Sequence, residues 1–151
     1  MATTQAAAVM VVCPACGTVN RLPVTKLESG AKPKCGRCGV AIFDGQPITI
    51  KSAEDMAHHL ARNEIPVLVD FWAPWCGPCQ AMAPHFAAAA ERMEPKVRFA
   101  KANTDALPQI ASRYNIRGIP TLILFAKGQE IARRSGLLDA STIERWVDSE
   151  L

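Results

Sequence analysis

The chain contains three cysteine pairs with the same C-x-x-C spacing, which account for all of its cysteines. The pairs are Cys13/Cys16, Cys35/Cys38 and Cys76/Cys79. Two cysteines at this spacing can bind a metal ion, form a structural disulfide, or cycle between dithiol and disulfide. These chemistries need different surroundings, so the residues around each pair indicate what the pair does.

The first two pairs have the spacing of a zinc ribbon. Eighteen residues separate them, within the range typical of such sites. Four thiolates complete a closed tetrahedral shell around Zn²⁺, which is the structural type of zinc site. Gly17 and Gly39 follow the pairs directly and allow tight turns that aim backbone amides at the sulfurs. The predicted ligands of one structural zinc ion are Cys13, Cys16, Cys35 and Cys38. Two disulfides, or a redox pair that has lost its role, remain the alternative.

The segment around these four cysteines also favours a metal. Residues 11–44 are short, rich in proline and glycine, and lack a long periodic segment, so they cannot bury much core by themselves. Metal binding would supply the missing folding free energy. A Zn²⁺ ion with four thiolates carries a net charge of −2, and nearby basic residues can offset it. These are Arg21, Lys26, Lys32, Lys34 and Arg37.

The third pair lies in a different setting. It follows the apolar run 65–72, which predicts a central buried strand, and it opens a helix over about 76–93. Pro78 suits the first helical turn, and Cys76 at the helix N-terminus has its thiolate stabilised by the macrodipole and free amides. Gln80, not glycine, follows the second cysteine. This arrangement predicts a redox dithiol; a metal pair without partner ligands is the alternative.

Composition and charge exclude several classes of function. The chain has 151 residues, 49% hydrophobic and 21% charged, with a net charge of only +3. The excess of positive charge lies before residue 47 and is too small to indicate nucleic-acid binding. No apolar run reaches the roughly 20 residues of a membrane span. Residues 1–12 lack the basic start and cleavage segment of a signal peptide, so we expect a cytoplasmic protein whose thiols stay reduced.

The pattern after Pro47 predicts the order β-α-β-α-β-α-β-β-α. Expected strands are 48–50, 65–72, 97–102, 121–125 and 129–133; expected helices are 52–63, 76–93, 105–115 and one from about 141. The predicted caps are Ser52, Asp105, and Ser141 with Glu144 as its capping-box partner. A mixed sheet with helices on both faces is the natural packing. We therefore expect a small zinc-ribbon-like module with its linker over 1–46 and an α/β domain over 47–151.

Two segments of this second part resemble the thioredoxin family. Residues 69–79, VDFWAPWCGPC, are similar to its active-site segment, and residues 117–121, RGIPT, are similar to its cis-proline loop. Lys127-Gly128 and Gly136 match a hairpin turn and a surface glycine. With the two N-terminal cysteine pairs, the whole chain resembles the zinc-containing thioredoxin 2 type. The resemblance implies a thioredoxin fold and a protein-disulfide reductase activity.

The resemblance also implies roles for individual residues. Cys76 would attack a substrate disulfide as the exposed cysteine, and Cys79 would then resolve the mixed disulfide. Asp70 is the one acid in the apolar run, so burial should raise its pKa and suit it to proton transfer. Lys101 matches a family lysine near that acid. A structural, hydrogen-bonded carboxylate and an ordinary surface lysine are the respective alternatives.

A client-binding surface is implied around the dithiol. Pro120 is expected to follow a cis peptide bond, and the backbone of Ile119 is expected to pair with an extended client. The predicted substrate-binding residues are Trp75, Gly77, Pro78, Gly118, Ile119, Pro120 and Gly136, with Leu137 beside them. Core packing is the alternative for Trp75. His58, His59 and His85 have no spaced partners and are predicted to face solvent.

The expected partners are protein disulfides and an NADPH-dependent thioredoxin reductase, because the chain has no nucleotide or flavin motif. We expect a monomer with zinc and no organic cofactor. Gly-Pro between the cysteines favours a reductase over an oxidant or isomerase. A zinc-dependent redox sensor or chaperone-like binding module is the alternative function.

Overall fold

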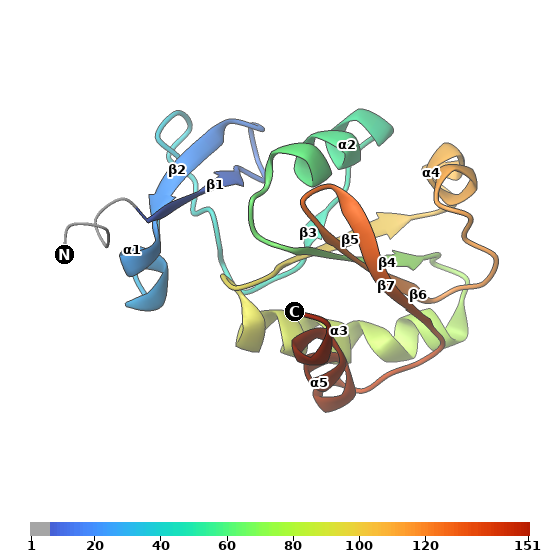
Figure 1. Ribbon diagram of the computed structural model, residues 1–151. Coiled ribbons are helices and arrows are strands. Elements are labelled where there is room, and N and C mark those ends of the chain that lie inside the picture. The colour runs from blue at the N-terminus through green and yellow to red at the C-terminus, as the bar shows by residue number, and fades with distance from the viewer. Residues whose placement is uncertain (1–6) are drawn as a thin grey trace.

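The computed structural model describes residues 7–151, which form two separate β-sheets (Figure 1). In the first sheet, β1 (Ala8–Val12) pairs antiparallel with β2 (Val19–Pro23), and α1 (Val24–Glu28) follows. The sequence pattern did not predict these three elements. The prediction about the N-terminal start concerns residues 1–12, of which residues 1–6 lie outside the described residues.

The second sheet has five strands and is mixed, as predicted. Its strands are β3 (Ile48–Thr49), β4 (Val67–Trp72), β5 (Arg98–Asn103), β6 (Thr121–Ala126) and β7 (Gln129–Ser135). They are arranged in the order β3-β5-β4-β6-β7. Strands β3, β5 and β4 run parallel, whereas β6 is antiparallel to β4 and β7 to β6.

Four helices cover the two faces of this sheet. They are α2 (Ala53–Arg62), α3 (Gly77–Met93), α4 (Pro108–Arg113) and α5 (Ala140–Glu150). Figure 1 shows α3 and α5 on one face and α2 and α4 on the other. The predicted order β-α-β-α-β-α-β-β-α is therefore confirmed. No helix among residues 7–151 is long and apolar enough to cross a membrane.

The central strand β4 is buried on both faces because helices cover both. Successive side chains point to opposite faces of a strand, so Leu68 packs in the cluster under α3 and α5 with Phe86. Val69 packs in the cluster under α2 and α4 with Met56. The continuous apolar run that predicted a central strand reflects this double burial.

The predicted start of α2 is confirmed. Ser52 is the N-cap, and its hydroxyl oxygen accepts a 2.9 Å hydrogen bond from the amide of Asp55. The side chain satisfies an amide that has no partner within the helix.

The predicted start of α4 is wrong. The helix begins only at Pro108, after the N-cap residue Leu107, and it ends at Arg113. Asp105 lies in a turn instead, where its amide donates to the side-chain oxygen of Asn103 at 2.9 Å. Asn103 takes up the amides of the turn, so the helix starts later than the sequence indicated.

The predicted capping box of α5 is also wrong. Asp139 is the N-cap, and its carboxylate accepts a 2.8 Å hydrogen bond from the amide of Thr142. Glu144 reaches across to α3 instead, where Arg92 donates to it at 2.7 Å. A tertiary ion pair has replaced the expected local contact.

The N-terminal module packs against α2 and the segment before β4. Its apolar cluster contains Val11, Leu22, Ile42 and Phe43, together with Ile65 from the segment before β4. The two parts of the chain therefore share buried apolar surface.

His58 and His59 face this junction. The prediction that the histidines face solvent is wrong for His59. It is only 1% exposed and lies 3.5 Å from Asp55 and 3.1 Å from the side-chain nitrogen of Asn63. Burial lowers the pKa of His59 to about 4, which keeps the ring neutral. His58 is half-buried, with a ring nitrogen 2.7 Å from the carbonyl oxygen of Gly17.

Candidate functional site

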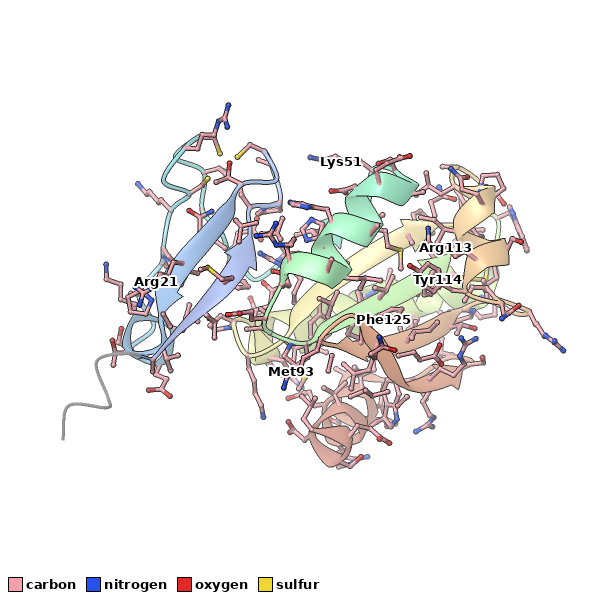
Figure 2. The ribbon with its side chains drawn as sticks, turned by 45° about the horizontal axis from the view of Figure 1, so that its top comes forward. Arg21, Lys51, Met93, Arg113, Tyr114 and Phe125 are labelled. Carbon is pink, nitrogen blue, oxygen red and sulfur yellow. A yellow bond between two sulfur atoms is a disulfide. The ribbon has the colours of Figure 1, made fainter. Side chains whose placement is uncertain are left out.

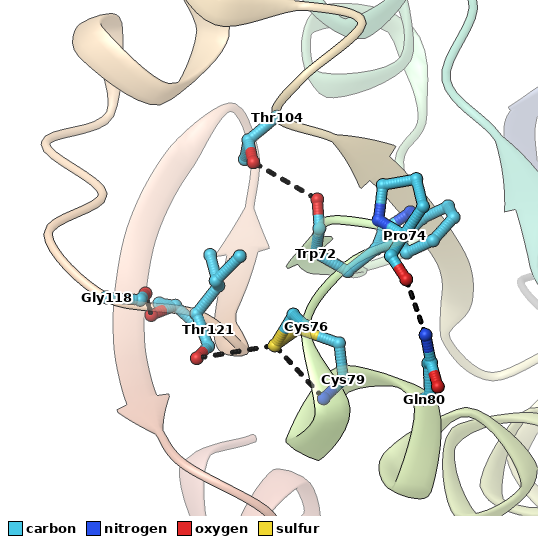
Figure 3. The surroundings of a disulfide bond; sticks show 9 residues. Trp72, Pro74, Cys76, Cys79, Gln80, Thr104, Gly118 and Thr121 are labelled. Atoms are coloured by element: carbon cyan, nitrogen blue, oxygen red, sulfur yellow. Dashed lines mark hydrogen bonds between the residues drawn. A yellow bond between two sulfur atoms is a disulfide. The ribbon is translucent and has the colours of Figure 1, made fainter.

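A disulfide joins Cys76 and Cys79 at the N-terminal end of α3 (Figure 3). Cys76 is the N-cap, and its sulfur accepts a 3.2 Å hydrogen bond from the amide of Cys79. Pro78 occupies the first helical turn, where the missing amide costs no hydrogen bond. The strand-to-helix position predicted from the sequence is confirmed.

Exposure does not separate the two cysteines in this disulfide form. Cys76 is 4% exposed and Cys79 is 2% exposed, so the expectation of an exposed Cys76 is wrong here. What differs between the cysteines is position. Cys76 lies outside the first turn, beside the exposed residues Gly77 and Pro78, whereas Cys79 lies within the helix.

The loop before β6 faces the disulfide. The carbonyl oxygen of Ile119 lies 3.8 Å from the sulfur of Cys76, and Ile119 packs in one apolar cluster with both cysteines. The Ile119–Pro120 peptide bond is cis, as predicted. Gly136 lies next to this loop, because its amide donates to the carbonyl of Pro120 at 2.9 Å.

The remaining residues predicted to bind substrate lie around this loop and the disulfide. Trp75 is 70% exposed, which rules out the alternative that it packs in the core. Gly118 and Gly136 are exposed, and Leu137 is 50% exposed. Together these residues form an uncharged, partly apolar surface, which we call the dithiol rim: Trp75, Gly118, Ile119, Gly136 and Leu137.

Asp70 is completely buried on β4. Neither of its carboxylate oxygens has a hydrogen-bond partner among the described residues, so the alternative of a hydrogen-bonded structural acid is not supported. Burial raises its pKa from 3.8 to about 7, although the positive charge of Lys101 acts in the opposite direction. A carboxyl group with this pKa can accept and release a proton near neutral pH.

Lys101 lies directly opposite Asp70 on the adjacent strand β5. Its ammonium nitrogen is 4.6 Å from the centre of the Trp72 ring, a cation–π contact. The side chain is half-buried. The structure thus places Lys101 beside Asp70, as the family resemblance implied, and adds Trp72, which was not predicted.

The four N-terminal cysteines converge in one cluster. All four sulfurs lie within 4.8 Å of one another, and the Cys13–Cys38 and Cys16–Cys35 distances are both 3.7 Å. Sulfurs in a tetrahedral site with Zn–S bonds of about 2.3 Å would lie about 3.8 Å apart. The four thiols therefore fit zinc. Cys13 and Cys35 are buried, whereas Cys16 and Cys38 are exposed.

The two cysteine loops have the same backbone geometry. In the first, the amide of Gly17 donates to the carbonyl of Cys13 at 3.0 Å, and the amide of Ala15 points at the Cys13 sulfur at 3.4 Å. Gly39 and Cys35 repeat the backbone bond at 2.9 Å. Both glycines have φ near +80° (79° and 81°), which other residues adopt only with strain. The predicted role of these glycines is confirmed.

Asn20 supports this cluster and was not predicted from the sequence. Its side-chain nitrogen lies 3.5 Å from the sulfur of Cys35, and its oxygen accepts from the amide of Gly36 at 2.9 Å. Hydrogen bonds, first from the backbone of Cys38 and then from Asn20, lower the pKa of the Cys35 thiol to about 5. These bonds favour the thiolate that a metal requires. A lone asparagine on a short strand carries no spacing signal that would have revealed it.

The fold and the dithiol define a thiol–disulfide oxidoreductase. Two family models match the chain: "Thioredoxin" over residues 47–149 and "Thioredoxin 2, N-terminal" over residues 12–40. The chain belongs to the thioredoxin family and has the N-terminal cysteine module of the thioredoxin 2 type.

Individual relatives show the same likeness. Thioredoxin C-3 of Corynebacterium nephridii is 42% identical over 142 residues, covering 94% of this chain and 95% of its own. Thioredoxin 1 of a Nostoc species is 45% identical but covers only 59% of this chain and 83% of its own. The solved structure of a mutant thioredoxin from Halobacterium salinarum superposes with a TM-score of 0.64 at 33% identity, covering 70% of this chain and 91% of that one.

Proposed function

We propose that the protein reduces disulfides in other proteins by dithiol–disulfide exchange through Cys76 and Cys79. The observation that carries this proposal is the position of the Cys76 sulfur, at the α3 N-terminus and 3.8 Å from the Ile119 carbonyl in the dithiol rim. An extended client chain lying along Ile119 would bring its own disulfide to Cys76. The zinc site is proposed to be structural, since four protein thiolates leave no open position.

The first step is attack by the Cys76 thiolate on a client sulfur. The amide of Cys79 and the positive end of the helix dipole stabilise the negative charge on the Cys76 sulfur. A mixed disulfide forms between Cys76 and the client, and the second client cysteine leaves as a thiolate.

The second step is resolution by Cys79. Its thiol must lose a proton inside the helix packing, and Asp70 is proposed to accept that proton because its pKa is about 7. The Cys79 thiolate then attacks the Cys76 sulfur, which releases the reduced client and restores the Cys76–Cys79 disulfide. Lys101 is proposed to tune Asp70 through its positive charge.

The proposal also covers client binding, the source of electrons and the division of the chain. The dithiol rim together with Gly77, Pro78 and Pro120 is proposed to bind the client, and an NADPH-dependent thioredoxin reductase is proposed to return electrons to the dithiol. We also propose a division of the chain into a zinc module over 1–46 and a catalytic domain over 47–151. A cytoplasmic location and a monomeric state remain predictions.

Reduction of insulin disulfides by dithiothreitol tests the proposal. The wild-type chain should accelerate the reaction well above the rate with dithiothreitol alone, and Cys76→Ser should abolish the acceleration. Arg92→Met, on an exposed turn of α3, serves as a control that should retain it. An accelerated reaction with Cys76→Ser would overturn the assignment.

A further inference from the structure

The zinc module and the dithiol lie at opposite ends of the molecule. Cys76 caps the N-terminus of α3, and this helix runs for 17 residues, or about 25 Å at 1.5 Å per residue. At its other end, Glu94 contacts Arg98, and Arg98 donates to the carbonyl of Ile42 in the module at 2.7 Å. Figure 1 shows the C-terminal, yellow end of α3 beside the module and its light-green N-terminal end on the far side.

The cysteine loops themselves contact the side of the molecule formed by β3 and α2. The ammonium group of Lys51 donates to the carbonyls of Pro14 and Ala15 at 3.0 and 3.3 Å (Figure 2 labels Lys51). β3 is the edge strand, and β5 lies between it and β4. Two strand spacings amount to about 10 Å, so the cysteine cluster lies lateral to the sheet as well as away from the N-terminus of α3.

Several bonds hold the module in this position. The amide of Val12 donates to the side chain of Asn63 at 2.8 Å, a buried contact. Glu64 and Met10 exchange two further bonds of 2.8 Å, one of them between backbone groups. The guanidinium of Arg98 lies 4.2 Å from the centre of the Phe43 ring. The module therefore cannot swing over to the dithiol while the native junction persists.

Thiol–disulfide exchange needs direct contact between sulfurs. If the four N-terminal cysteines are oxidised, the dithiol of the same molecule is too far away to reduce them. A dithiol on a second copy of the chain has no such restriction, because the Cys76 end of α3 is bordered by exposed residues such as Trp75.

The oxidised module also presents sulfurs that an outside thiolate can reach. The two pairs with sulfurs 3.7 Å apart, Cys13–Cys38 and Cys16–Cys35, each combine one buried and one exposed cysteine. Pairing within each C-x-x-C gives the same combination. Either arrangement leaves one exposed sulfur in each disulfide, at Cys16 and at Cys38.

We propose that the oxidised cysteine module is itself a substrate of the dithiol, reduced only in trans by a second copy of the chain. This inference rests on the proposed disulfide-reductase function. Oxidation by two hydroperoxide molecules converts four thiols to two disulfides and yields two molecules of alcohol and two of water, or four of water when the oxidant is hydrogen peroxide. Each disulfide then takes two electrons and two protons from one reduced dithiol.

The exchange follows the same two steps as with any client. The Cys76 thiolate of one copy attacks the exposed sulfur of Cys16 or Cys38, and the buried partner leaves as a thiolate. Cys79 then attacks the Cys76 sulfur, frees the module cysteine and closes the Cys76–Cys79 disulfide. Two reduced copies thus restore all four ligand thiols of one module.

The test uses the Cys76→Ser/Cys79→Ser double variant, oxidised with hydrogen peroxide, as the substrate. Reduced wild-type chain is the electron donor, and reduced double variant is the control donor. Thiols of the substrate are counted by alkylation and mass spectrometry, and zinc rebinding is followed from a zinc buffer. Wild-type donor should restore four thiols per substrate chain, at a rate that rises about tenfold for a tenfold higher donor concentration. The control donor should restore none.

A second arm compares oxidised wild-type chain with the oxidised double variant under the same donor. Their modules should be re-reduced at rates within about twofold, because the substrate's own dithiol cannot reach its module. A faster wild-type rate that persists on dilution would show reduction in cis and overturn the inference. Failure to restore the thiols while insulin reduction is intact would also overturn it, whereas failure of both reactions would overturn the proposed function.

A Cys79→Ser donor identifies the attacked sulfur. It should form a covalent adduct between its Cys76 and either Cys16 or Cys38 of the substrate. An adduct found only at Cys13 or Cys35 would contradict the proposal.

Discussion

The Cys76 sulfur lies 3.8 Å from the carbonyl oxygen of Ile119, although 43 residues separate them in the chain. The contact exists because β4 and β6 are neighbours and antiparallel, so the end of one meets the beginning of the other. A helix N-terminus that stabilises a thiolate thereby faces a loop that can hold an extended client. The proposed chemistry depends on this meeting of two distant segments.

Trp75 tests whether the dithiol rim binds protein clients. We expect Trp75→Ala to raise the KM for a protein disulfide about tenfold, equivalent to about 1.4 kcal/mol of binding free energy. Reduction of a small disulfide such as DTNB should change less than about twofold, because the dithiol itself is unaltered. Steady-state kinetics with both substrates measure the difference. Leu151→Ala, an apolar residue 48% exposed at the C-terminus, is the matched control, and an equal loss with both substrates would argue against a binding role.

Asp70 should make the free energy of unfolding fall as the pH rises from about 4 to about 7. Its folded-state pKa of about 7 lies above 3.8, so the folded protein binds the proton more tightly than the unfolded chain. The resulting stabilisation is full below about pH 4 and is lost as the pH rises towards about 7. Asp70→Asn should therefore raise the free energy of unfolding of the oxidised protein by up to about 4 kcal/mol at pH 8, with little change near pH 4.

Denaturant unfolding at the two pH values measures this effect, with the exposed Asp148→Asn as control. The same Asp70→Asn variant should resolve mixed disulfides at least about tenfold more slowly, because Cys79 loses its proton acceptor. Unchanged resolution kinetics would contradict the proposal that Asp70 accepts the proton of Cys79.

Arg98 is the largest fully buried side chain among the described residues and carries a charge at the junction of the two parts. Arg98→Met would leave Glu94, whose side chain is 1% exposed, without its charged partner and with only the 3.1 Å hydrogen bond from the amide of Phe99. We expect a loss of about 3 kcal/mol in the free energy of unfolding at pH 8. The loss should shrink at pH 5: burial already raises the pKa of Glu94 to about 7, so the acid takes up a proton there.

The exposed pair Arg92–Glu144 supplies the matched comparison for Arg98. Its atoms lie 2.7 Å apart, yet Arg92 is 54% exposed, so Arg92→Met should change stability by less than about 1 kcal/mol. Equal changes in the free energy of unfolding for Arg92→Met and Arg98→Met would contradict the expectation that the buried pair at the junction contributes more to stability than the exposed pair.

The zinc site predicts a simple stoichiometry. In protein whose Cys76 and Cys79 are joined as a disulfide, four equivalents of an organomercurial should release about one zinc per chain. A chromophoric chelator measures the release. Removal of the metal should also expose the amides of β1 and β2 to hydrogen exchange, because the module depends on the metal for folding free energy. Purified reduced protein without any bound metal would contradict the assignment.

The sequence predicted the strands and helices after Pro47 and both cysteine sites because these follow from local patterns, whereas β1, β2 and α1 carry no such pattern and were missed. Apolar runs marked β4 and β6, and cysteine spacing marked the two sites. Features set by tertiary contacts were missed. Arg98 shares an alternating strand with Lys101, but it lies on the same face as Ala100, where the module covers it. His59 is buried for the same reason, since Asn63 beside it binds β1.

The most direct test of the account is the attachment site of a trapped client. A Cys79→Ser variant is incubated with oxidised client proteins, and its mixed disulfides are mapped by mass spectrometry. We expect adducts through Cys76 that dithiothreitol releases, and none when Cys76→Ser is added to the variant. Adducts through the N-terminal cysteines alone, or no adducts at all, would contradict it.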